Sequence, residues 1–135
     1  MSAKLIFLLI IIIVLLIYCS PFTSKKSENV LYVDDVYKLI LENEHNPDFV
    51  ILDVRSKKEY NNGHLKNAIN ISYFSTVFMD KISNLDKSKT YIIYCHSGVR
   101  SGGAFKKMKN AGFNSIYDFS GGFTAWKKSD KPYIE

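Results

Sequence analysis

The feature that most restricts the fold is a nearly continuous apolar run, Phe49-Val50-Ile51-Leu52-Asp53-Val54. A strand with one face in water alternates apolar and polar side chains, whereas a strand covered on both faces is apolar throughout. Strands of the second kind occur mainly in parallel sheets that carry helices on both faces. The run therefore predicts an α/β protein, and the buried run at 91–94 predicts a second strand of the same sheet.

The rest of the chain alternates between strand and helix patterns. Further strands are predicted at residues 30–33, 68–71 and 115–119. Helices are predicted at residues 34–44, 56–60, 74–85, 100–111 and 121–126. Asp34 is the expected N-cap of the first helix, and Gly112 is well placed to end the fourth. This alternation predicts an α/β domain with a mainly parallel sheet of about five strands.

Composition limits the class of protein. A chain of 135 residues with 47% apolar and 23% charged residues is typical of one globular domain. The net charge of +5 comes from scattered lysines, without a dense basic run interleaved with aromatic residues, so we expect no nucleic-acid partner. Two cysteines and three scattered histidines indicate neither a disulfide-stapled scaffold nor a structural zinc site.

Residues 1–24 are predicted to be a separate segment, followed by a domain over 25–135. Lys4 precedes an unbroken apolar run at 5–17, which is shorter than the roughly 20 residues of a membrane-spanning helix. A positive charge before a short apolar stretch is typical of a secretory signal. The protein is therefore expected to be exported, either periplasmic or attached to a bacterial inner or outer membrane by this segment.

Two interpretations of this segment are open. In the first, the segment is cleaved or lipidated at Cys19, because residues 16–19 resemble the lipobox of bacterial lipoproteins, although Tyr18 stands where a small residue is usual. In the second, the apolar run continues through Phe22 as an uncleaved anchor of about 18 residues, the lower edge of the spanning range.

The candidate site follows the strand at 91–94. Cys95 ends that strand, a short loop with Gly98 follows, and a helix begins near Arg100. The N–H groups of such a loop can converge on an anion, and the helix N-terminus adds partial positive charge. A thiol in this field should have a depressed pKa and be largely thiolate near neutral pH. Arg100, one of only two arginines, suits an oxyanion because its guanidinium is planar and permanently charged.

The loop at 95–101, Cys-His-Ser-Gly-Val-Arg-Ser, resembles the Cys-x-x-Gly-x-Arg-Ser active-site loop of the rhodaneses, the thiosulfate sulfurtransferases. Further blocks agree with that family in order and spacing, at residues 53–55, 59–60, 63–71, 112–113 and 121–126. The likeness covers about residues 30–128. It implies a single rhodanese domain, with a five-stranded parallel sheet and helices on both faces. It implies no metal and no organic cofactor.

The resemblance also implies a reaction. Cys95 would attack the outer sulfur of thiosulfate and become a persulfide, which cyanide, a thiol or a protein acceptor then discharges. The residues of the loop would hold the donor or the persulfide; they are His96, Ser97, Gly98, Val99, Arg100 and Ser101.

Individual roles differ within that loop. Arg100 would bind the sulfonate end of the donor or order the loop. Ser97 and Ser101 could donate hydrogen bonds to sulfur, although Ser101 could equally cap the helix. His96 is expected to be a solvent-exposed side chain. An internal ion-pair set is expected to hold the second strand to its helix; its members are Asp53, Arg55 and Glu59.

Two other functions are kept open. One is a cysteine phosphatase or arsenate reductase, whose loop of this kind has five residues between cysteine and arginine, where this chain has four between Cys95 and Arg100. The other is a non-catalytic binding module, which commonly lacks the cysteine. Gly102 and Gly103 depart from the family pattern, and we expect them to loosen the first helical turn and widen access to the loop.

Overall fold

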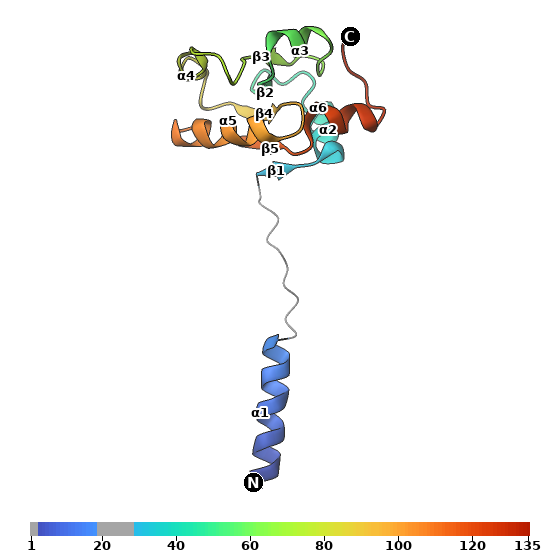
Figure 1. The fold of residues 1–135 in the computed structure, drawn as a ribbon, viewed down its shortest axis with the longest axis vertical. Coiled ribbons are helices and arrows are strands. Elements are labelled where there is room, and N and C mark those ends of the chain that lie inside the picture. The colour runs from blue at the N-terminus through green and yellow to red at the C-terminus, as the bar shows by residue number, and fades with distance from the viewer. Residues whose placement is uncertain (1–2, 19–28) are drawn as a thin grey trace.

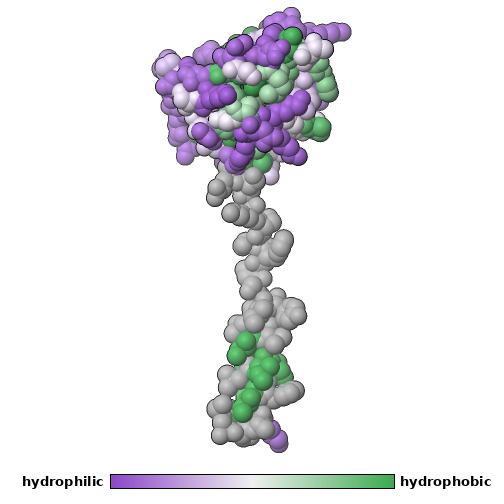
Figure 2. Space-filling model, turned by 90° about the vertical axis from the view of Figure 1, so that its left-hand side faces the viewer, coloured by the Kyte–Doolittle hydropathy of each residue, from purple (hydrophilic) through white to green (hydrophobic). Residues whose placement is uncertain are grey.

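The computed structural model describes residues 3–18 and 29–135. Residues 3–18 form helix α1 (Ala3–Tyr18), and its described apolar side chains, such as Leu5 and Ile13, are exposed (green in Figure 2). Within these described ranges, no helix is both long enough and apolar enough to cross a membrane. Cys19 and Phe22, on which the lipidation and anchor predictions depend, lie outside the described residues.

The remaining elements alternate between strand and helix (Figure 1). The strands are β1 (Val30–Leu31), β2 (Phe49–Asp53), β3 (Ile69–Asn70), β4 (Thr90–Tyr94) and β5 (Ile116–Phe119). The helices are α2 (Val33–Glu42), α3 (Lys57–Asn61), α4 (Phe78–Ser83), α5 (Val99–Asn110) and α6 (Gly122–Lys128). The strands form one parallel sheet in the order β1-β5-β4-β2-β3. The predicted α/β class and parallel five-stranded sheet are confirmed.

Helices cover both faces of this sheet (Figure 1). On one face, Leu52 and Ile93 pack with residues of α4 and α5 in one core cluster. On the other face, Ile51 and Ile92 pack with residues of α2 and α6, including Trp126. Because neighbouring residues of a strand point to opposite faces, an apolar side chain is needed at nearly every position of β2 and β4. This requirement accounts for the continuous apolar run in the sequence. The buried exception is Asp53 at the end of β2, which is paired with Arg55.

Three predicted boundaries are wrong. Helix α4 begins at Phe78, because residues 75–78 form a turn and Phe74 is 77% exposed instead of continuing the apolar face. Helix α2 begins at Val33 with Tyr32 as N-cap, so Asp34 lies in the first turn, where its charge complements the helix dipole. Strand β1 is correspondingly shorter than predicted, because Tyr32 leaves the sheet to begin this helix.

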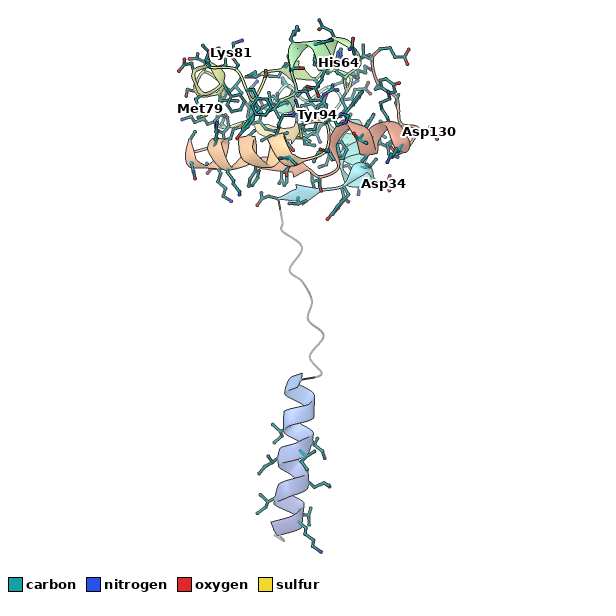
Figure 3. All side chains as sticks on the ribbon, viewed as in Figure 1. Asp34, His64, Met79, Lys81, Tyr94 and Asp130 are labelled. Atoms are coloured by element: carbon teal, nitrogen blue, oxygen red, sulfur yellow. The ribbon has the colours of Figure 1, made fainter. Side chains whose placement is uncertain are left out.

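The strand that leads to the candidate site is firmly held. Tyr94, the last residue of β4, is fully buried among the side chains at the centre of the domain (Figure 3). Its hydroxyl accepts a hydrogen bond from the Leu65 N–H at 3.1 Å. The Tyr94 ring also lies 5.5 Å from the Arg55 guanidinium carbon. The residue that follows, Cys95, therefore starts from a fixed backbone position.

Candidate active site

The candidate site lies at the carboxyl edge of the sheet. Asp53 ends β2, Cys95 follows β4 directly, and the Gly121-Gly122 pair comes just after β5. The carboxyl ends of parallel strands meet at one edge, so the fold brings together segments that are far apart in the sequence. Open α/β sheets bind their ligands at this edge.

The loop after β4 closes around the Cys95 sulfur. The Gly98 N–H donates a hydrogen bond to Sγ at 3.1 Å, and the Cys95 residue is only 1% exposed. Gly98 adopts a φ of +107° just before α5, a conformation that favours glycine. Burial alone would raise the pKa of the Cys95 thiol, but hydrogen bonds from Ser101, Gly98 and Ser97 together outweigh it and lower the pKa. The loop is therefore suited to a sulfur anion.

Arg100 is held by Glu59. Its two terminal nitrogens donate to the two carboxylate oxygens of Glu59, each at 2.7 Å. Glu59 also accepts hydrogen bonds from the N–H and hydroxyl of Ser56, at 3.0 and 2.8 Å. The hydrogen bond from Arg100 is the main cause that lowers the pKa of Glu59 to about 2. Of the two roles predicted for Arg100, this geometry supports the ordering of the loop.

The predicted ion-pair set separates into two pairs. Arg55 pairs with Asp53 at 2.7 Å, and both side chains are almost completely buried. Arg55 also donates to the Gly63 carbonyl at 2.6 Å, and its guanidinium carbon lies 4.2 Å from the centre of the Phe123 ring. The partner of Glu59 is thus not Arg55, and Glu59 connects α3 to α5 instead of to β2.

Helix α6 is attached to the loop through its first residues. The Phe123 N–H donates to the Cys95 carbonyl at 2.8 Å, and the Thr124 N–H donates to the His96 carbonyl at 3.0 Å. A side chain at Gly122 would collide with the Cys95 carbonyl, so this close approach requires glycine there. The sequence analysis did not single out Phe123 or Thr124. The Gly121-Gly122 pair before them was the one sequence feature that could have indicated a close backbone contact here.

The other loop residues lie at different depths. His96, Ser97 and Val99 are exposed, and His96 Nε2 lies 3.2 Å from the Thr124 hydroxyl. Ser101 is fully buried, and its hydroxyl donates to the Gly98 carbonyl at 3.1 Å, within the first turn of α5. The N-cap of α5 is Gly98, without a side-chain cap, so Ser101 does not cap this helix. The N–H and hydroxyl of Ser101 are among the groups that lower the pKa of Cys95, which supports the alternative of hydrogen bonding to sulfur.

Gly102 and Gly103 do not interrupt the helix, and their expected effect on access to the loop stays a prediction. Helix α5 is continuous over both residues. A Cβ atom at Gly103 would lie 2.5 Å from the Tyr73 hydroxyl oxygen, so Gly103 admits the Tyr73 side chain against the helix. A Cβ atom at Gly102 would lie 3.6 Å from Oδ2 of Asp118, a side chain that the sequence analysis did not identify.

Among residues 3–18 and 29–135, no group of three or more His, Cys, Asp or Glu side chains could hold a metal ion. Cys95 is a free, buried cysteine. The site offers a thiol of lowered pKa, with a backbone N–H donated to its sulfur and an ion pair between Arg100 and Glu59 beside it.

The family model of the rhodanese-like domain matches residues 33–129. The thiosulfate sulfurtransferase GlpE of Coxiella burnetii is 32% identical over 80 residues, which cover 59% of this chain and 73% of the relative. The chloroplastic thiosulfate sulfurtransferase 16 of Arabidopsis thaliana is 34% identical over 91 residues, which cover 60% of this chain and 76% of the relative. A crystal structure of a rhodanese-related protein from Thermoplasma volcanium superposes with a TM-score of 0.68 at 27% identity, covering 78% of this chain and 97% of that one.

Proposed function

This chain belongs to the rhodanese-like domain family, and on that premise we propose that it is a sulfurtransferase that carries sulfur as a persulfide on Cys95. The observation that carries the proposal is the loop at 95–101. It encloses a thiol of lowered pKa and directs backbone N–H groups toward its sulfur. The names of the relatives, thiosulfate sulfurtransferases from a bacterium and a plant, support thiosulfate as the donor.

The first step loads the enzyme. The Cys95 thiolate attacks the outer sulfur of thiosulfate and forms a new S–S bond, while the bond between the two thiosulfate sulfurs breaks. Its electron pair leaves with sulfite, and the negative charge of the persulfide comes to rest on the transferred sulfur. The Gly98 N–H, which lies 3.1 Å from Sγ, belongs to the set of backbone donors that would stabilise this charge.

The second step discharges the enzyme. A nucleophilic acceptor, such as cyanide, attacks the outer sulfur and leaves as thiocyanate, and the electron pair returns to Cys95. Each step moves one sulfur atom from one nucleophile to another and releases the electron pair of the broken bond to the leaving group, so neither step needs an external oxidant or reductant.

Access to the sulfur requires local movement of the side chains that cover it. Cys95 is 1% exposed, so the donor meets its sulfur only when covering side chains move aside. Val99 is 83% exposed, and His96 and Ser97 are also exposed, so these side chains can move without loss of core packing. Arg100 and Ser101 remain tied to Glu59 and Gly98 and keep the base of the loop in place. A small sulfur atom fits such a loop better than a bulky group does.

Steady-state turnover tests the proposal. The full chain should convert thiosulfate and cyanide to sulfite and thiocyanate. Cys95→Ser should abolish turnover, because a serine hydroxyl is scarcely ionised near neutral pH. Cys19→Ser is the matched control and should retain the parent rate. A parent protein that hydrolyses an aryl phosphate but leaves thiosulfate unchanged would support the phosphatase alternative, and inactivity toward both would support a binding module.

A further inference from the structure

A cavity of about 440 Å³ lies beside the loop, lined in part by His96, Phe123 and Thr124. This volume lies within the range of about 300–1,000 Å³ that is typical of sites for organic ligands. It is far larger than a thiosulfate or cyanide ion needs. Phe123 is one of the lining residues, and an aromatic side chain suits the carbon skeleton of an organic molecule.

Helix α6 forms one wall of this cavity. Its first turn is fixed to the loop, because the Phe123 N–H bonds to the Cys95 carbonyl at 2.8 Å. Residues four positions apart lie on the same face of a helix, so Lys127 follows Phe123 and Lys128 follows Thr124 along the cavity wall. Both lysines line the cavity. The backbone therefore fixes the points from which both lysine side chains extend, relative to the loop.

The two lysines supply the cavity's uncompensated charge. Arg55 and Glu59, which also line it, are paired with Asp53 and Arg100, each at 2.7 Å.

Neither Lys127 nor Lys128 has a carboxylate within 4.0 Å among the described residues. The Lys127 ammonium lies 6.0 Å from the ring centre of Phe123 and 5.5 Å from that of Tyr133. The lining of the cavity thus combines an aromatic residue, Phe123, with two cations that have no carboxylate partner.

We propose that this cavity binds the acceptor of the sulfur, and that Lys127 and Lys128 select thiols that carry a carboxylate. The inference rests on the proposed function, because it assigns the second half of that reaction. The acceptor thiolate attacks the outer sulfur of the Cys95 persulfide, a new S–S bond forms, and the bond to Cys95 breaks with return of its electron pair. The product is the persulfide of the acceptor, with no net oxidation or reduction.

Charge explains why two lysines are useful here. An acceptor thiolate and a persulfide repel each other, and a carboxylate on the acceptor adds to that repulsion unless cations oppose it. The ammonium groups of Lys127 and Lys128 can hold the carboxylate while the thiolate end points toward the loop. An acceptor thiol without a carboxylate is bound less strongly by these ammonium groups.

The test uses the full chain loaded with thiosulfate and then freed of excess donor. Single-turnover rates of persulfide loss are measured with two thiols. 3-Mercaptopropionate carries a carboxylate, and 2-mercaptoethanol carries a hydroxyl in its place. In Lys127→Gln/Lys128→Gln, the ratio of the two rates should fall about tenfold, equivalent to about 1.4 kcal/mol. The matched control, Lys106→Gln/Lys109→Gln, removes two exposed charges of α5 that do not line the cavity, and its ratio should equal that of the parent.

The outcomes separate this inference from the proposed function. A parent protein that thiosulfate cannot load contradicts both. If the protein loads, but the ratio is the same in the parent and in Lys127→Gln/Lys128→Gln, only the inference is overturned. An equal fall in the control variant also overturns it, because the effect would then come from net charge. Added salt should reduce the preference for the carboxylate thiol in the parent.

Discussion

The ion pair between Arg100 and Glu59 leads to a quantitative prediction. Its two charge-assisted hydrogen bonds, both 2.7 Å, are of a kind worth about 1.5–3 kcal/mol when fully buried. The two side chains are 19% and 34% exposed, so water screens part of the attraction. We therefore expect a coupling free energy of about 1–2 kcal/mol between these residues.

A double-mutant cycle measures this coupling. The free energy of unfolding is determined by urea denaturation for the parent, Arg100→Gln, Glu59→Gln and the double variant. Each single variant should also lower the Tm by roughly 5–10 °C. The exposed pair of Lys66 and Glu44 is the matched control and should show no measurable coupling. A coupling of about zero for the first pair would refute the conclusion that Arg100 is a structural brace.

The pH dependence provides a second check on the same pair. Arg100 is the main cause that lowers the pKa of Glu59 from 4.5 to about 2. Between these two pH values, the folded state therefore binds fewer protons than the unfolded state. The stabilisation is therefore complete above about pH 4.5 and is lost as the pH falls toward 2. The difference in unfolding free energy between the parent and Glu59→Gln should shrink over this interval. A constant difference would contradict the reasoning.

Three further predictions concern other parts of the chain. Gly103→Ala should lower the free energy of unfolding by about 1 kcal/mol, because its Cβ would press on Tyr73, whereas Gly102→Ala should not destabilise the protein; urea unfolding of both variants checks this. Burial raises the pKa of Asp118, so the buried carboxylate destabilises the folded state at neutral pH and Asp118→Asn should raise the Tm there. Below about pH 3.8 the variant should bring no gain, because the parent carboxyl is then protonated in the folded and the unfolded state. We propose that residues 1–24 direct export, so cell fractionation should find the protein outside the cytoplasm; full-length protein in the soluble cytoplasm would contradict this.

The central strands were predictable because burial on both faces leaves a continuous apolar pattern. The run at 49–54 and the run at 91–94 each correspond to a strand of the sheet centre. Edge strands leave a weaker signal, and β1 and β3 are both only two residues long. Phe74 misled the helix assignment, because an exposed aromatic residue near an apolar face has the same spacing as a buried one.

The site was predictable in its loop but not in its supporting contacts. The spacing of cysteine, glycine and arginine along 95–100 is local, so it can be read from the sequence. The partner of Arg100 lies 41 residues away, at Glu59, and Arg55 offered a nearer alternative. The attachment of α6 to the loop depends on backbone groups of Phe123 and Thr124, which no side-chain pattern reveals.

The loading of Cys95 with sulfur is the most direct test of the proposed function. The full chain is reduced, incubated with thiosulfate, and weighed intact by mass spectrometry before and after addition of cyanide. The account predicts a gain of one sulfur atom, its removal by cyanide, and no gain in Cys95→Ser. A folded, reduced protein that never gains sulfur would contradict the assignment, as would a gain that persists in Cys95→Ser.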